Sequence, residues 1–200
     1  MTFNNWKSLN IGGNKLKRLV RVSDGLILFE LPSGPDYSEP FWIQGDGVTT
    51  NSQLFFTTNT DPSTLSPILM SYDNKSWTPI ELKKNPFGNT WASQNFYAKD
   101  GRKIYFMRDS EVPIGFGQNS ASNTYIYGSY IENEPVFIIG GNINSLICKN
   151  FSNLKDISGI ERCFSNAFLA ESIVNADALL LPAKNIGLSC YNNIFNQDKA

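Results

Sequence analysis

The sequence Cys163-Phe164-Ser165-Asn166-Ala167-Phe168 returns 27 residues later as Cys190-Tyr191-Asn192-Asn193-Ile194-Phe195. Both copies fit the template C-[FY]-x-N-x-F. A unit of this length cannot bury its apolar side chains alone, so it stacks on a neighbouring unit. Cysteine is small and apolar, and it suits the closely packed interior of such a stack. The sequence therefore predicts two stacked units with the core residues Cys163, Asn166, Phe168, Cys190, Asn193 and Phe195.

The interval between the two copies also indicates an architecture. A strand-like run, Ala-Leu-Leu-Leu at residues 178–181, lies between them and ends at Pro182. Repeats of about 20–29 residues that combine one strand with one short helix are typical of leucine-rich-repeat solenoids. We therefore expect residues 142–200 to form a short leucine-rich-repeat α/β segment with two partial repeats.

Upstream of the repeat, residues 41–141 contain short β-runs separated by turn residues at intervals of about ten residues. Turns are indicated by Asp46-Gly47, Asp73-Asn74-Lys75 and Asp100-Gly101, and helical periodicity is almost absent. Many short strands with regular turns predict an antiparallel β-sandwich. The expected strands are residues 41–44, 54–58, 68–72, 77–82, 91–97, 103–108, 124–130 and 136–139.

The N-terminal residues 1–31 differ in charge from the rest of the chain, with five Lys and Arg residues against two acidic residues. Asp24-Gly25 lies between two β-rich runs and predicts a hairpin arm. Residues 32–40 contain three prolines and predict a semi-rigid linker. The basic residues form either an attachment surface for an acidic partner or an ordinary solvated face. The candidate attachment residues are Lys15, Lys17, Arg18 and Arg21.

The composition excludes several kinds of chemistry. The chain has no histidine, which excludes Ser-His-Asp triads, Cys-His dyads and His-ligated zinc. Catalysis by carboxylates or lysine stays open, but no pair of carboxylates stands out. The three cysteines form no CxxC pair. We therefore expect a protein that is not an enzyme, with no catalytic residues, no cofactor and no metal site.

The net charge and the hydropathy of the chain indicate which partners to expect. The formal net charge of −1 disfavours general nucleic-acid binding, which needs a basic surface. The longest apolar runs are the size of a strand, so we expect no membrane insertion. No apolar stretch of a secretory signal follows the first residues. Aromatic residues offer one candidate binding surface, a glycan-stacking face, although the same residues suit a β-sandwich core. They are Trp42, Trp77 and Trp91.

The repeat region resembles a known family. Residues 141–146, the two template copies and residues 179–183 between them resemble BspA-like leucine-rich-repeat proteins of gut Bacteroides-type bacteria and their phages. Residues 71–78 and 98–106 are similar to the β-sandwich that often precedes such repeats. The resemblance covers about residues 68–195. It departs from the family in having few repeats, and in having Leu169-Ala170-Glu171 where Cys-Thr usually follows the Phe.

Residues 11–20 and 25–30 are similar to a short leader of phage virion proteins, G-x-K-x-x-[KR]-L…G-x-[IL]-x-[WF], which matches at residues 13–19 and 25–29. Together with the missing export signal, this resemblance implies a phage structural protein that assembles in the host cytoplasm and is found on the virion. It would be a head-fibre, tail-fibre-like or capsid-decorating appendage for host attachment. Its expected partners are capsid or tail proteins, further copies in a homo-oligomer, and a host-surface glycan or protein. The alternative is a bacterial BspA-like cell-surface adhesion or carbohydrate-binding module.

Overall fold

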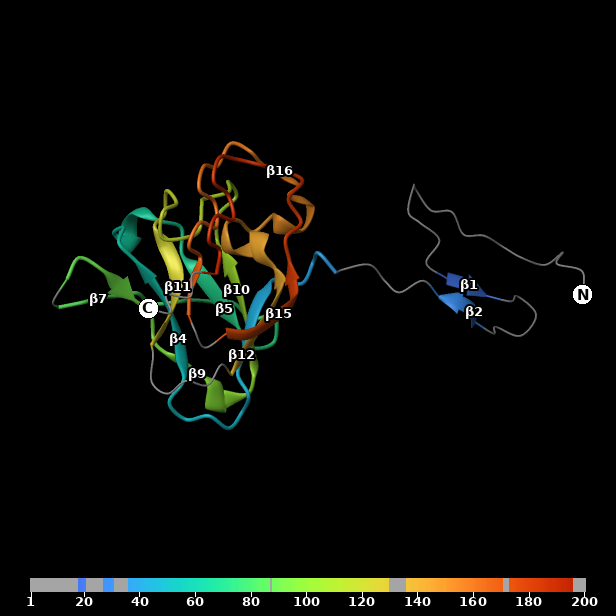
Figure 1. Ribbon diagram of the computed structural model, residues 1–200, viewed down its shortest axis with the longest axis horizontal. Helices are drawn as coiled ribbons and strands as arrows, with labels where there is room; N and C mark the ends of the chain where they lie inside the picture. The colour runs from blue at the N-terminus through green and yellow to red at the C-terminus, as the bar shows by residue number, and fades with distance from the viewer. Residues whose placement is uncertain are drawn as a thin grey trace, which may run out of the picture. The chain divides into compact units, whose positions relative to one another are not determined.

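The computed structural model describes residues 18–20, 27–30, 36–86, 88–129, 136–170 and 173–195. The chain divides into two compact units, Met1–Asp36 and Tyr37–Ala200 (Figure 1). The predicted mainly β class is confirmed, since the regular elements of the described residues are strands and short 3-10 helices. In the first unit, β1 (Arg18–Val20) pairs in antiparallel fashion with β2 (Ile27–Glu30). Residues 31–35 of the expected linker lie outside the described residues.

The second unit contains two large sheets. In the first, the strand order is β15-β12-β3-β10-β5-β6. Its central strand β10 alternates between buried Ile104, Phe106 and Arg108 and half-buried residues between them, the pattern of a strand with one face in the core. The bounds are β3 (Phe41–Gln44), β5 (Ile68–Ser71), β6 (Thr78–Pro79), β10 (Lys103–Arg108), β12 (Phe137–Asn142) and β15 (Ile173–Leu180).

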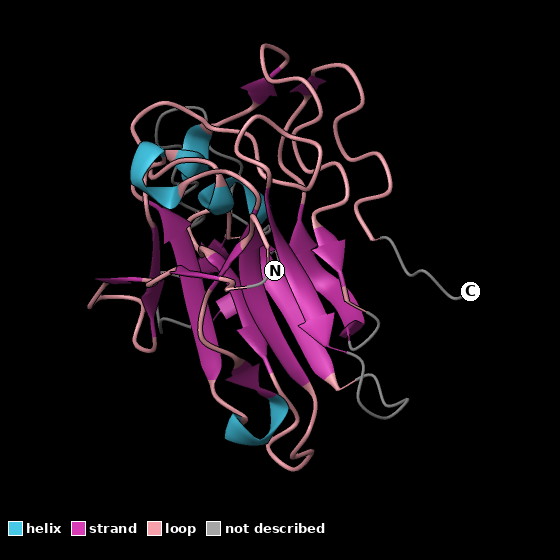
Figure 2. Ribbon diagram, turned by 90° about the vertical axis from the view of Figure 1, so that its left-hand side faces the viewer, coloured by secondary structure: helices cyan, strands magenta, loops and turns pink. Residues whose placement is uncertain are grey.

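The second sheet has the order β14-β11-β4-β8-β7, and β9 also pairs with β4. Figure 2 shows that the 3-10 helices lie at the ends of the strands. The strand bounds are β4 (Gln53–Thr58), β7 (Lys83–Lys84), β8 (Trp91–Ala92), β9 (Phe96–Tyr97), β11 (Thr124–Ser129) and β14 (Phe168–Leu169). The helices are η1 (Pro62–Thr64), η2 (Ala98–Asp100), η3 (Ile143–Leu146) and η4 (Phe151–Asn153). A small parallel pair joins β13 (Asp156–Ile157) to β16 (Asn185–Ile186).

Both large sheets are mixed, and their parallel strands come from outside residues 41–141, the region for which the sequence predicted antiparallel pairing. The chain after η4 adds one parallel strand to an edge of each sheet: β15 pairs with β12, and β14 pairs with β11. The expected strand at 91–97 is divided into β8 and β9. The reason is local, because the Ser93 hydroxyl accepts a hydrogen bond from the Phe56 N–H at 3.0 Å and replaces a backbone partner. The expected run at 178–181 overlaps the end of the longer β15.

Aromatic side chains join the two sheets. The rings of Phe106 in β10 and Phe56 in β4 lie 4.9 Å apart between centroids. Phe106 also contacts Phe96 and Phe41, at 5.3 Å and 6.2 Å. Phe106, Phe56 and Phe41 are fully buried. Such pairs stabilise a fold by about 0.5–1.5 kcal/mol each beyond the burial of their area. The two sheets therefore share one apolar core.

Buried polar residues hold η3 against the first sheet. Arg108 is 1% exposed, and its Nε and Nη1 donate to the carbonyls of Leu146 and Ser66, both at 3.0 Å. Desolvation lowers the pKa of Arg108 to about 10. The fully buried Asn142 caps η3 by accepting from the Asn144 N–H at 3.0 Å. These contacts join sheet and helix through groups that would otherwise be buried without partners.

Candidate interaction surface

The two template copies share one backbone conformation. Counting the residue directly before each copy, three alternate residues have left-handed φ values between 48° and 63°. This conformation costs most residues free energy but is tolerated by asparagine. The positions correspond at the 27-residue interval of the template. They are Arg162, Phe164 and Asn166 in the first copy and Ser189, Tyr191 and Asn193 in the second.

The two copies stack on each other. We call residues 156–168 the inner coil and residues 185–195 the outer coil. Parallel pairing of β13 with β16 joins their beginnings. Further along, the Arg162, Asn166 and Phe168 N–H groups of the inner coil donate to carbonyls of the outer coil. The backbone hydrogen bonds are Arg162 to Leu188 (2.8 Å), Asn166 to Asn192 (3.1 Å), Phe168 to Ile194 (2.9 Å) and Tyr191 to Cys163 (3.0 Å).

Side chains of the two coils form a second set of contacts. The rings of Phe164 and Tyr191 are stacked at 5.4 Å with an interplanar angle of 3°. Those of Phe168 and Phe195 are stacked at 5.3 Å and 18°. Cys163 is a free, fully buried thiol, and burial raises its pKa to about 12. A thiol in this environment is a packing group and a poor nucleophile.

The inner coil contacts the sheets through the segment before β11. The Phe164 N–H donates to the Phe116 carbonyl at 2.5 Å, and the two rings lie 6.5 Å apart. Gly117 has φ +127°, and a Cβ there would overlap the Ser165 backbone. Ile126 in β11 donates its N–H to the Ala167 carbonyl at 2.9 Å. The repeat pattern could not predict this contact, because residues 114–117 lack the Cys and Asn of the template.

The six expected repeat-core residues divide into two groups. Cys163, Phe168 and Cys190 are buried, at 0%, 1% and 8% exposure. Asn166 is half-buried and Asn193 is exposed, and both have φ 48°. Asn166 and Asn193 thus contribute to the fold by adopting the left-handed backbone conformation. Phe195, the sixth, is stacked on Phe168 but is 40% exposed.

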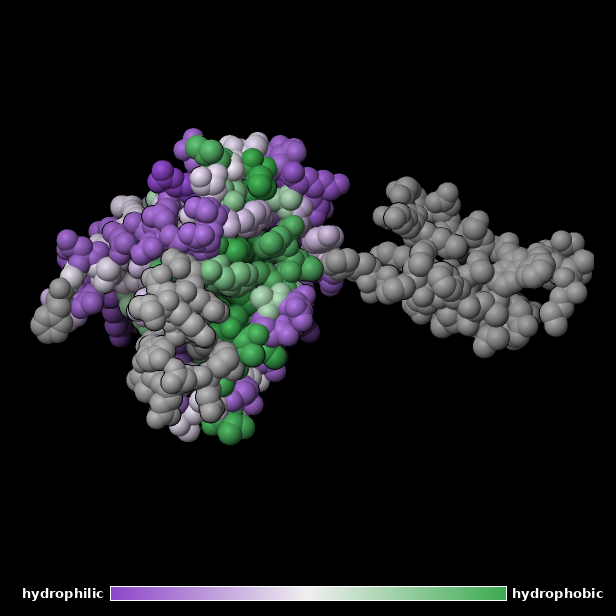
Figure 3. Space-filling view, viewed as in Figure 1, coloured by the Kyte–Doolittle hydropathy of each residue, from purple (hydrophilic) through white to green (hydrophobic). Residues whose placement is uncertain are grey.

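Apolar side chains of the outer coil are exposed where their inner-coil counterparts are covered. Ile186 is 50% exposed, whereas Ile157, its partner in β13, is 1% exposed. Phe195 and Phe168 differ in the same way. Leu188 is 71% exposed. Figure 3 shows hydrophobic residues near β16 and over β12 and β15. We call Ile186, Leu188 and Phe195 the outer-coil face.

The candidate attachment residues lie mostly outside the described part of the chain. Lys15, Lys17 and Arg21 are not among the described residues. Arg18 lies in β1, where its backbone is opposite Glu30 of β2. Their role in attachment therefore stays a prediction.

The three candidate glycan-stacking tryptophans lie in different surroundings. Trp42 in β3 is 7% exposed, and Lys103 Nζ lies 4.0 Å from the centroid of its ring. Trp77 and Trp91 are half-buried. Trp91 in β8 belongs to the other sheet, with Lys84 Nζ 5.5 Å from its ring. The buried Trp42 leaves little ring surface for a sugar, whereas the other two leave more.

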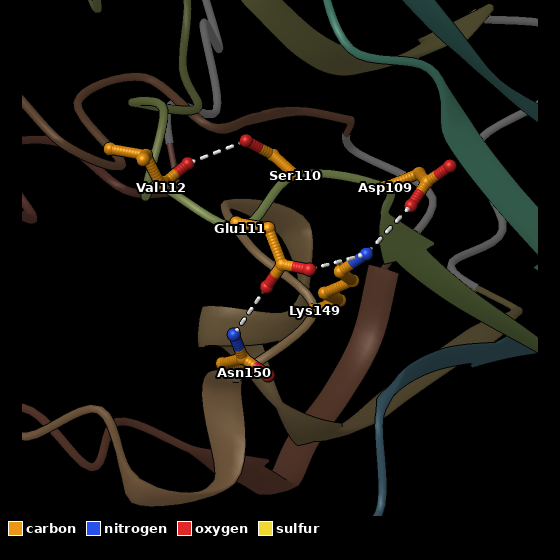
Figure 4. Close-up of polar contacts among 6 residues, drawn as sticks. All are labelled: Asp109, Ser110, Glu111, Val112, Lys149 and Asn150. Carbon is orange, nitrogen blue, oxygen red and sulfur yellow. Dashed lines mark hydrogen bonds and ion pairs between the residues drawn. The ribbon is translucent and has the colours of Figure 1, made fainter.

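Charged groups gather where the loop after β10 meets the end of η3 (Figure 4). Lys149 Nζ lies 2.8 Å from Glu111 and 3.6 Å from Asp109, and Asn150 donates to Glu111 at 2.7 Å. The hydrogen bond from Lys149 is the main cause of the lowered pKa of Glu111. Because these groups are exposed, each ion pair contributes little to stability. The cluster connects two loops.

Neither a metal site nor a membrane span is found in the part of the chain that the structure describes. In residues 18–20, 27–30, 36–86, 88–129, 136–170 and 173–195, no three His, Cys, Asp or Glu side chains are grouped as metal ligands would be. No helix of these residues has the length and apolar character of a membrane span. Comparison with protein-family models, curated proteins and solved structures gives no match. The resemblance to BspA-like and phage proteins therefore stays a prediction.

Asp156 connects the two coils by hydrogen bonds. Its carboxylate accepts from the Ser158 hydroxyl at 2.7 Å, from the Ser158 N–H at 2.9 Å and from the Asn185 side chain at 3.0 Å. These bonds lower the pKa of Asp156 from its ordinary value of 3.8, the Ser158 hydroxyl having the largest effect. The ionised carboxylate therefore favours the stacked coils.

Substitution of Asn193 tests whether the left-handed conformation is its contribution. We expect Asn193→Ala to lower the free energy of unfolding by about 1 kcal/mol, because alanine is strained at positive φ. Asn193→Gly should change it little. The adjacent, exposed Asn192 has no positive φ, so Asn192→Ala is the matched control. Urea unfolding followed by tryptophan fluorescence measures the difference, and equal losses at the two positions would contradict the assignment.

The pH dependence of stability tests the Asp156 contacts. A folded-state pKa below the unfolded value adds stability that is fully present above the unfolded pKa and is lost as pH falls through the folded pKa. We therefore expect Asp156→Asn to be less stable than the native protein at about pH 6, with the difference shrinking as the pH falls toward about 2. Thermal unfolding at several pH values measures it. A difference that is constant over this range would show that the charge of Asp156 has no role.

Proposed function

We propose that the protein is a non-enzymatic structural protein of a phage virion, a head-fibre or tail-fibre-like appendage. The N-terminal unit, Met1–Asp36, attaches to the particle, and the unit Tyr37–Ala200 is displayed for recognition of a host-surface glycan or protein. The observation that carries this proposal is the division of the chain into a small and a large unit at the point where the sequence changes from basic to weakly acidic. The similarity of residues 13–19 and 25–29 to a virion-protein leader supports it.

We also propose the finer architecture of the displayed unit. Its two sheets form a β-sandwich, supported by the direct contact of Phe56 and Phe106 across them. Its two coils are a leucine-rich-repeat-like segment, supported by the matched left-handed residues and the parallel pairing of β13 with β16. Such a unit presents a continuous surface built from several layers. Attachment as a symmetric homo-oligomer would place several copies of that surface side by side.

The alternative is a bacterial cell-surface adhesion or carbohydrate-binding module. The half-buried rings of Trp77 and Trp91 favour this second function, because partly exposed aromatic faces suit stacking against sugars. In that case Met1–Asp36 would have no role on a particle. The same displayed unit can serve either function, so the two differ in location and in the role of the N-terminal unit.

The test is incorporation into virions of the phage that encodes the protein. We expect mass spectrometry of purified particles to detect the full chain. Deleting residues 1–36 should abolish incorporation, because the expected attachment residues are lost. A fusion of residues 1–36 to a fluorescent carrier should attach by itself.

Two controls make this result interpretable. Circular dichroism of the deletion variant must show that residues 37–200 keep their β structure. A variant with Lys15, Lys17, Arg18 and Arg21 changed to Gln tests charge without removing the unit. It should attach more weakly than the native chain at low salt and should depend less on salt, because screening acts on the charges that it lacks. Absence of the native chain from virions, or incorporation of the deletion variant, would contradict the proposal.

A further inference from the structure

Among residues 136–170 and 173–195, the inner coil is covered by the outer coil, and no further layer covers the outer coil in turn. Phe168 is 1% exposed and has Phe41 and Phe195 stacked on it, whereas Phe195 has only Phe168 among the described rings stacked on it and is 40% exposed. Ile157 is covered through the pairing of β13 with β16, and its partner Ile186 is 50% exposed. Corresponding residue positions are thus buried in the inner coil, on which the outer coil lies, and exposed in the outer coil among the described residues. The outer-coil face therefore has the shape and chemistry of a surface that a coil covers.

The backbone of the outer coil presents the corresponding groups. In the inner coil, the N–H groups of three residues and one carbonyl bond to the outer coil. The φ values at the left-handed positions match in the two copies. The counterparts of these four backbone groups, 27 residues later in the chain, therefore point away from the inner coil. Within residues 136–170 and 173–195, no hydrogen bond uses these four counterparts. They are the N–H groups of Ser189, Asn193 and Phe195 and the carbonyl of Cys190.

We propose that the outer coil is an acceptor site for a further polypeptide coil of the template C-[FY]-x-N-x-F, added parallel and in register. This acceptor site would continue the interface that already joins the inner coil to the outer coil. The added coil would place an aromatic ring on Tyr191 and a Phe on Phe195, as Tyr191 and Phe195 lie on Phe164 and Phe168. This proposal rests on the proposed display function, and it names a class of partner for the outer-coil face. Addition of an extended segment to an open backbone edge is a general mode of peptide recognition.

The same groups disfavour a second copy as the occupant. The acceptors that an added coil must offer are the carbonyls of Leu188, Asn192 and Ile194, and in every copy these already bond to its own inner coil. Two outer coils that meet face to face would bring their N–H groups together without matching acceptors. A separate segment that carries the template has all three acceptors free.

The probe is a synthetic peptide with the sequence of residues 185–195, carrying a fluorescent label and kept reduced. Titration with the 200-residue protein, followed by fluorescence anisotropy, should show saturable binding, and a scrambled peptide should show none. Hydrogen exchange measured by NMR should slow at the amides of Ser189, Asn193 and Phe195 when the peptide is bound. Binding of both peptides with equal affinity, or of neither, would overturn the proposal.

Methylated peptides test the register. An N-methyl group at the position that copies Tyr191 removes the N–H needed for the Cys190 carbonyl, and it should weaken binding by about three- to tenfold. An N-methyl group at the position that copies Ser189 is the control, because that N–H points away from the acceptor coil. Equal effects of the two would contradict parallel, in-register stacking.

A pair of exposed leucine and valine positions gives matched protein variants. Leu188 and Val112 are 71% and 70% exposed, so Leu188→Lys and Val112→Lys should both fold. Leu188→Lys places a charge in the proposed site and should weaken peptide binding by about tenfold or more. Val112→Lys should bind as the native protein does, and equal affinities of the two variants would overturn the site.

These outcomes are separate from those of virion incorporation. A protein that enters virions but fails to bind the peptide overturns the acceptor site alone. A protein that binds the peptide but is absent from virions overturns the proposed function alone. If the native protein self-associates, Leu188→Lys makes it monomeric and the peptide does not bind, a second copy covers the face and the acceptor proposal is wrong.

Discussion

The hydrogen bond from the Phe164 N–H to the Phe116 carbonyl joins the C-terminal coils to the sheets, and the rest of the C-terminal structure depends on it. It forms only where the chain before β11 can approach the inner coil backbone closely, which requires glycine at position 117. Once Phe164 is placed, the ring of Tyr191 has a surface on which to stack. The pairing of β14 with β11 continues the same contact into the second sheet.

Each layer of this stack completes the burial of the one before it. Phe164 contacts Phe116 and the outer-coil Tyr191, and Phe168 contacts Phe41 of β3 and the outer-coil Phe195. Both Phe164 and Phe168 are almost fully buried. No described residue covers the outer coil in this way, and its apolar residues Ile186, Leu188 and Phe195 are exposed. A protein that displays the outer-coil face can recognise a partner through backbone groups and ring surfaces together. This is the physical link between the repeat in the sequence and the proposed role in recognition.

Local patterns in the sequence predicted the parts of the fold that depend on local information. Residues 41–44 and 103–108 are strands as expected, because apolar residues and flanking turns mark them clearly. Such patterns could not predict contacts between residues that are far apart in the chain. The parallel addition of β15 joins residues more than 30 positions apart in the chain, and its polar Asn175 and Asp177 interrupt the apolar run by which a strand is recognised. The segment around Phe116 lacks the Cys and Asn of the template, so the repeat pattern could not predict its contact with Phe164.

The central claim is that the inner coil and the sheets form one cooperative unit. Native-state hydrogen exchange tests it most directly, because it gives an opening free energy for each amide. We expect the amides of Phe164 and Phe168 to open with the same free energy as that of Phe106 in β10, and Gly117→Ala to lower all three together. If the Phe164 and Phe168 amides exchange freely while Phe106 stays protected, the coils are not held by the sheets and the account is wrong.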